Sequence, residues 1–120
     1  MDDSTTIAHL KDCAQKFCDD RDWGQFDTAK DIAIGVITEA SELLEMFRFK
    51  TEQEINDMLQ QPERREKISE ELADVLYFLL RFSQKYDIDL ATEFSKKMIK
   101  NEKHYPIEKS KGVNKKYTEL

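Results

Sequence analysis

The sequence has 120 residues, of which 37% are charged and 39% apolar, with only 3 glycines and 2 prolines. This length is enough for one compact domain and too short for two ordinary ones. The net charge of −6 argues against a protein that coats nucleic acid, which would carry a basic face, but a small anionic ligand fits if the acids hold a metal.

Local sequence patterns argue against two further classes of protein, membrane-spanning proteins and secreted proteins. No stretch approaches the roughly 18 uninterrupted apolar residues of a membrane span, and the acidic N-terminus lacks the pattern of a signal peptide. Cys13 and Cys18 lie five residues apart, which is neither a CxxC pair nor a zinc spacing. We therefore expect both cysteines to be reduced packing residues in a cytoplasmic protein that has no membrane partner and no nucleic-acid polymer as partner.

Apolar residues recur at three- and four-residue steps along most of the chain, which predicts helices. The apolar stripes of the two longest helices, which include Ile37 and Leu44 on one and Leu72, Leu76 and Leu79 on the other, are expected to face the core. In chain order, the predicted helices cover residues 5–19, 28–49, 51–60, 63–86 and 90–103. Thr51 and Glu54 have capping-box spacing at the start of the short third helix, and Pro62 closes it. Strand-like alternation occurs nowhere, so the predicted fold class is all-α.

The C-terminal segment differs from the rest of the chain. Residues 106–120 follow the stop at Pro106 and are polar, basic and without periodicity. We expect them to form a flexible arm. The expected organisation is therefore one helical domain at residues 1–105, built as a four-helix-type bundle, and an arm at residues 106–120.

Two acidic pairs occupy equivalent places on the two longest helices. Glu39 and Glu42 lie in EASELL, and Glu71 and Asp74 lie in ELADVL. At about 100° per residue, each pair lies on the same flank of its helix's apolar stripe. If the two helices pack antiparallel, the pairs converge into a cluster of four carboxylates.

Such a cluster cannot stay fully ionised without a cation, because close like charges raise each other's pKa. Mg²⁺ is the expected guest, since it prefers oxygen ligands and keeps positions open for water and phosphates. Acid pairs three residues apart are also common on solvated helix faces, so a purely structural role for them stays open.

The same residues resemble a known family. ExxE on one helix and ExxD on a later one is the pattern of the all-α nucleotide pyrophosphohydrolases, the MazG-like group. The stretches RDWGQF, EASELLEMFRFK, EELADVL, KNEKHYP and KKYTEL are similar to the dCTP pyrophosphatase branch of that group. The resemblance implies a MazG-like bundle that assembles as a dimer or tetramer.

The resemblance also implies residue roles. Glu39, Glu42, Glu71 and Asp74 would hold Mg²⁺, and Glu39 or Glu42 would act in catalysis by taking a proton from the attacking water. Further residues would contact the substrate: Trp23, Lys30, Phe49, Tyr77, Phe78, Lys97, Asn101 and Tyr117.

The sequence departs from the family pattern at several of these places. Phe49 stands where relatives usually have a second tryptophan, and Tyr77-Phe78 replaces the usual Ile-Tyr order. Asp27 replaces a histidine in the stretch after Trp23. These changes bear on the identity of the base that the protein selects.

The function expected from the resemblance is Mg²⁺-dependent hydrolysis of a deoxynucleoside triphosphate between its α and β phosphates. The favoured substrate is dCTP or a modified dCTP, giving dCMP and pyrophosphate and serving nucleotide-pool sanitation. Two alternatives stay open: a less selective nucleotide pyrophosphohydrolase, and a non-catalytic helical module that binds a nucleotide or a protein.

Overall fold

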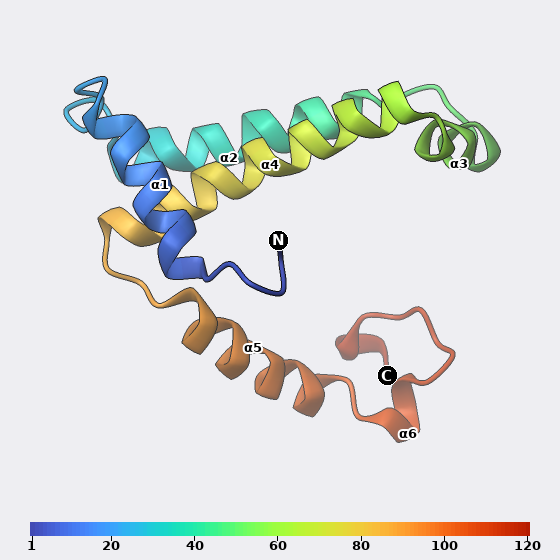
Figure 1. Ribbon diagram of the computed structural model, residues 1–120. Coiled ribbons are helices and arrows are strands. Elements are labelled where there is room, and N and C mark those ends of the chain that lie inside the picture. The colour runs from blue at the N-terminus through green and yellow to red at the C-terminus, as the bar shows by residue number, and fades with distance from the viewer. The chain divides into compact units, whose positions relative to one another are not determined.

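The computed structural model describes residues 1–120 and contains helices but no strand, which confirms the predicted all-α class (Figure 1). None of its helices has the length and apolar character needed to cross a membrane. In chain order the elements are α1 (Ile7–Asp19), α2 (Ala29–Glu45), α3 (Glu52–Gln60), α4 (Pro62–Lys85), α5 (Leu90–His104), α6 (Ile107–Ser110) and the 3₁₀ turn η1 (Tyr117–Glu119).

Helix starts follow the capping residues in the sequence. The side chains of Thr6, Thr28, Thr51 and Asp89 each accept a hydrogen bond from a backbone N–H in the first turn of the following helix. Pro62 occupies the first position of α4, where its missing N–H costs nothing.

The end of α2 differs from the prediction. The helix stops at Glu45 and not at Phe49, because the chain tightens into i→i+3 hydrogen bonds from Met46 onward. Phe49 then adopts a φ of 63°, in the left-handed region that terminates a right-handed helix. Apolar periodicity continues through this turn, so it could not mark the true end.

The chain forms two compact units, Met1–Asp87 and Ile88–Leu120. In the first unit α4 packs against α1, α2 and α3, and α2 runs antiparallel beside α4 (Figure 1). Few apolar side chains are buried there: Ala14, Cys18, Ile32, Met58, Ile68 and Leu80.

A close approach between α2 and α4 is centred on Gly35. A Cβ atom at this position would lie 2.5 Å from Cδ1 and 2.7 Å from Cζ of the Phe78 ring. The ring therefore occupies the space that any larger residue on α2 would need. Glycine destabilises a helix interior relative to alanine, but at this position it leaves room for the Phe78 ring to pack closely against α2.

Several residues predicted to face the core are exposed. Ile37 and Leu44 on α2 are each 70% exposed, and Leu72, Leu76 and Leu79 on α4 are also exposed. The prediction that these positions are buried is therefore wrong for the isolated chain. Periodicity identified the apolar stripes correctly, but each helix buries only part of its stripe against the other.

The second unit comprises α5, α6 and η1. None of the α5 residues is buried. The Tyr117 ring stacks on His104 with 4.3 Å between ring centroids and meets Tyr105 edge-on at 5.9 Å. Residues 106–120, expected to lack regular structure, thus contain two short helical segments. The first starts with Pro106 as its N-cap, and at four residues it is too short to produce a periodic signal.

Candidate active site

The antiparallel packing of α2 and α4 brings carboxylates from both helices together. Oxygen atoms of Glu39, Glu42 and Glu71 all lie within 4.8 Å of one another. Residues three apart share a helix face, so the two glutamates of α2 meet the one from α4 along a common flank. This spacing suits ligands of a single cation.

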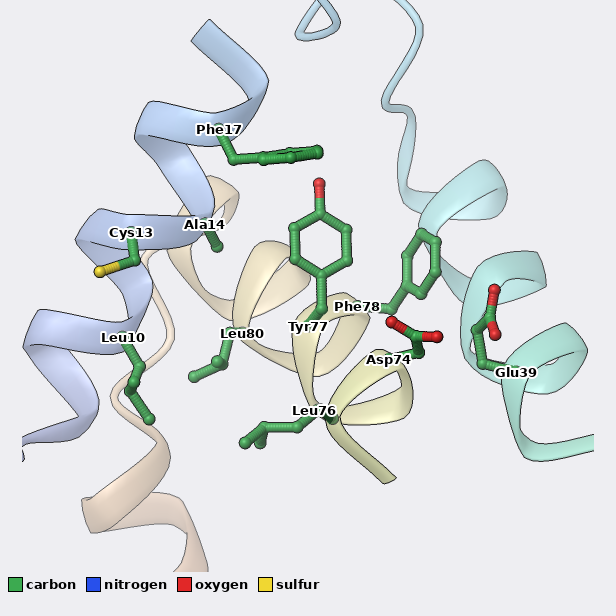
Figure 2. Close-up of a pocket in the computed structure, with 11 residues that line it drawn as sticks. Leu10, Cys13, Ala14, Phe17, Glu39, Asp74, Leu76, Tyr77, Phe78 and Leu80 are labelled. Carbon is green, nitrogen blue, oxygen red and sulfur yellow. The ribbon is translucent and has the colours of Figure 1, made fainter. Parts of the chain in front are cut away.

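Asp74, the fourth predicted acid, lies outside this group of three. It is exposed, and together with Glu39 it lines a pocket that adjoins the cluster. Figure 2 shows both carboxylates at the same end of that pocket, beside the Phe78 ring. Its negative charge also acts on Glu39 and Glu71.

The acids strongly perturb one another. The pKa of Glu39 is raised from 4.5 to about 7, first by burial, then by a hydrogen bond with Glu42 and the negative charges of its three acidic neighbours. The pKa of Glu71 is also raised, first by burial and then by the charge of Glu42. Glu71 Oε2 is buried and has no hydrogen-bond partner. An unpartnered carboxylate oxygen in an acidic cluster requires a proton or a cation.

The adjoining pocket has a volume of about 600 Å³ and is formed by α1, α2 and α4 (Figure 2). Its walls are mainly apolar and carry three aromatic rings, and the two acids lie at one end. The lining residues are Leu10, Cys13, Ala14, Phe17, Glu39, Ala73, Asp74, Leu76, Tyr77, Phe78 and Leu80. A pocket of this kind suits a ligand with a flat apolar part and a charged part that a cation can neutralise.

Tyr77 is held in a fixed orientation in the pocket wall. Its hydroxyl oxygen lies 2.9 Å from Cys18 Sγ. Its ring meets Phe17 edge-on at 5.8 Å and Phe78 at 5.1 Å between centroids. Burial, followed by the hydrogen bond with Cys18, raises the pKa of Tyr77, so the phenol stays neutral. It therefore offers the pocket a ring face and no charge.

Comparison with known proteins identifies the family. The sequence profile of the MazG-like family matches residues 34–120, which include all four acids. The chain belongs to the MazG-like family. This confirms the resemblance inferred from the ExxE and ExxD motifs.

Individual MazG-like relatives agree with this assignment. The chain is 32% identical to dCTP pyrophosphatase 1 of Rattus norvegicus over 115 residues, which is 96% of the chain and 68% of the relative. Identity to dCTP pyrophosphatase 1 of Homo sapiens is 31% over the same shares. A crystal structure of a pyrophosphatase from Archaeoglobus fulgidus is similar with a TM-score of 0.77 and 34% identity, covering 83% of this chain and 92% of that one.

Two aromatic residues that the family resemblance assigns to substrate binding, Trp23 and Phe49, do not line the pocket. Trp23 is 44% exposed and packs edge-on against Phe17, with 5.6 Å between ring centroids. Phe49 is 90% exposed, with the Arg48 guanidinium 4.6 Å from its ring centroid. Trp23 thus reaches the pocket wall only through Phe17. Tyr77 and Phe78, in contrast, line the pocket directly.

The other predicted substrate contacts are distributed over both units. Lys30 is exposed in the first turn of α2. Lys97 lies on α5 in a pocket of about 360 Å³ whose walls also include Lys96, Lys100, Lys103 and Glu93. Asn101 is half-buried, with its Nδ2 3.8 Å from Met98 Sδ. Tyr117 stacks on His104, as described above.

Sequence reasoning missed several residues that shape this MazG-like site. Leu10, Cys13 and Ala14 on α1 line the pocket, although their spacing signals only an apolar helix face. Cys18 was predicted to be a packing residue and is fully buried, but its sulfur also anchors Tyr77. No local pattern could show this, because the contact joins positions 59 residues apart.

Proposed function

We propose that this protein hydrolyses a deoxynucleoside triphosphate between its α and β phosphates in a Mg²⁺-dependent reaction, with dCTP or a modified dCTP as the preferred substrate. The chain is a nucleotide pyrophosphohydrolase, the class in which its relatives are named. One observation carries the proposal: an aromatic pocket ends at a cluster of carboxylates. The base would occupy the pocket and the phosphates would lie at the acids.

The donor set fits a hard divalent cation. Three carboxylates converge, Glu71 Oε2 is buried without a partner, and burial together with mutual repulsion raises the pKa of Glu39 and of Glu71. We assign Glu39, Glu42, Glu71 and Asp74 as the groups that hold Mg²⁺. When bound there, Mg²⁺ would neutralise triphosphate charge and polarise the phosphoryl group under attack.

Side chains at the site would also transfer the proton and bind the base. Glu39 is the member of the cluster that also lines the pocket, so we favour it over Glu42 as the group that accepts the proton of the attacking water. Phe17, Tyr77 and Phe78 offer ring faces to a base and exclude water from the pocket.

We propose separate roles for the remaining candidate contacts. Lys30, Lys97 and Asn101 would bind phosphate or sugar oxygens, and Tyr117 would close over the substrate with the C-terminal arm. Trp23 acts on the base through Phe17, which it contacts. Phe49 is the residue that replaces a usual tryptophan, and its lack of an N–H donor bears on base preference.

Self-association is the second part of the proposal. The exposed apolar residues form one stripe on each long helix: Ile34, Ile37 and Leu44 on α2, and Leu72, Leu76 and Leu79 on α4. Apolar stripes of this length on a small domain are a feature of interfaces. We therefore propose that the protein forms a dimer or tetramer through these stripes. Its free cysteines fit the reducing cytoplasm.

The test is incubation with Mg²⁺ and a panel of nucleoside and deoxynucleoside triphosphates, with separation of monophosphate, diphosphate, phosphate and pyrophosphate. We expect dCMP and pyrophosphate, both lost on chelation. Glu39→Gln and Asp74→Asn should abolish turnover, whereas Glu45→Gln, on the same helix as Glu39 and exposed, should retain it. Monophosphates from many bases would support the less selective enzyme, and no turnover of any nucleotide would support a binding module.

A further inference from the structure

The loop that joins α1 to α2, residues 20–28, is fastened to the C-terminal part of α4. Arg81 Nε donates a hydrogen bond to Asp27 Oδ2 at 2.9 Å. Lys85 Nζ donates to the backbone oxygen of Gly24 at 3.3 Å and to that of Asp27. Two cations of α4 therefore hold both the backbone and a side chain of one loop.

Arg81 is the central residue of this attachment. It is only 5% exposed, and the side chain of Asp27 is 23% exposed. Arg81 also donates to Gln84 Oε1 at 2.5 Å, and a Cβ atom on Gly24 would lie 3.7 Å from its Nη2. A buried guanidinium without a carboxylate partner is strongly unfavourable, so Asp27 fixes Arg81 and Arg81 fixes the loop.

The same carboxylate connects to the pocket wall. Asp27 Oδ2 lies 3.6 Å from Cys18 Sγ, and that sulfur lies 2.9 Å from the hydroxyl of Tyr77. A second connection consists of rings: Trp23, in the loop, contacts Phe17, and Phe17 contacts Tyr77. Both connections end at Tyr77, which lines the pocket.

We propose that Asp27 and Arg81 are positioning residues: their partly buried ion pair holds the 20–28 loop and Tyr77 so that the aromatic wall of the pocket is preformed for a base. This inference rests on the proposed function, since it needs a nucleotide in that pocket. A preformed wall lowers the ordering cost of binding, so the pair acts on substrate affinity and leaves the chemical step to the acids. The pair joins residues 54 positions apart.

The experiment compares Asp27→Asn, Arg81→Gln, Arg81→Lys and the double variant Asp27→Asn/Arg81→Gln. Asp20→Asn is the matched control, because Asp20 is the first residue of the same loop and belongs to an exposed ion pair with Lys16. Three quantities are measured: KM and kcat for dCTP, the melting temperature, and acrylamide quenching of Trp23, which is the only tryptophan.

Asp27→Asn and Arg81→Gln should each raise KM by about tenfold while kcat changes less than about twofold. Acrylamide should quench Trp23 more strongly in these two variants than in the wild type. Arg81→Lys keeps the positive charge, so it should raise KM less than Arg81→Gln does. The double variant removes both charges, so it should recover much of the lost melting temperature while its KM stays raised. The control should match the wild type in all three measurements.

Recovery of KM together with melting temperature in the double variant would show that the pair is structural only and would overturn the inference. An unchanged KM in all variants would do the same. If the wild type hydrolyses no nucleotide, the proposed function fails first. Quenching of Trp23 then still tests the attachment of the loop, and unchanged quenching in Asp27→Asn would refute it.

Discussion

Gly35→Ala tests the close approach between α2 and α4. The new methyl carbon would lie 2.5 Å from Cδ1 and 2.7 Å from Cζ of the Phe78 ring, which is well inside van der Waals contact. Alanine in a helix interior gains about 1 kcal/mol over glycine, whereas forcing an extra carbon into a packed site costs about 1–3 kcal/mol. The net result should be a decrease of up to about 2 kcal/mol in the free energy of unfolding.

Thermal unfolding measures this balance. For a chain of this size, each kcal/mol shifts the melting temperature by about 4 °C, so Gly35→Ala should lower it by up to about 8 °C. Ser41→Ala, at an exposed position of the same helix, is the control and should not lower it. A higher melting temperature for Gly35→Ala would refute the close approach.

A double-variant cycle separates the clash from other effects. If the new methyl group meets the ring of Phe78, Phe78→Ala should lower the free energy of unfolding less in the Gly35→Ala background than in the wild type. The displaced ring has the pocket as its nearest free space, since Phe78 already lines it. Gly35→Ala should therefore also raise KM, and equal costs of Phe78→Ala in both backgrounds would contradict this account.

Three further predictions concern the acids and the apolar stripes. The fold raises the pKa of Glu39 from 4.5 to about 7, so without metal its stabilising protonated form is lost as the pH rises through that range. Glu39→Gln should thus gain melting temperature over the wild type at pH 8 but not at pH 4, and an equal difference at both would contradict the shift. Mg²⁺ should raise the melting temperature of the wild type and raise that of Glu71→Gln by less than half as much; equal rises would remove Glu71 from the metal site. Ile37→Glu should reduce the mass measured by light scattering to that of one chain, and an unchanged oligomer would place the interface elsewhere.

Local features of the fold could be predicted from the sequence because their causes are local. Helix starts follow from Thr28, Thr51 and Pro62, each of which acts within one turn. The acid cluster was also predictable in part. Helical spacing places Glu39 beside Glu42, and antiparallel packing of the two longest helices is enough to bring Glu71 to them.

Features that depend on distant residues could not be predicted. The ExxD pattern places Asp74 on the same flank as Glu71, but it does not show that Asp74 turns to the pocket and lies outside the group of three. Apolar periodicity places Ile37 on a stripe, but it cannot say whether this chain or another covers that stripe. The Asp27–Arg81 pair spans 54 positions, and nothing in the sequence near either residue indicates the other.

The exposed stripes and the acidic cluster share a physical consequence. Only six apolar side chains are buried in 120 residues, while the flank of α2 and α4 carries mutually repelling carboxylates. Both features make the isolated, metal-free chain less stable than its length would allow. A ligand that binds only the folded state increases the free energy of unfolding as its concentration rises above its Kd. The increase is about 2.7 kcal/mol at a concentration of a hundred times Kd. A cation at the acids and a second copy on the stripes would both act in this way, so the additions that complete the proposed enzyme would also be the ones that stabilise its fold.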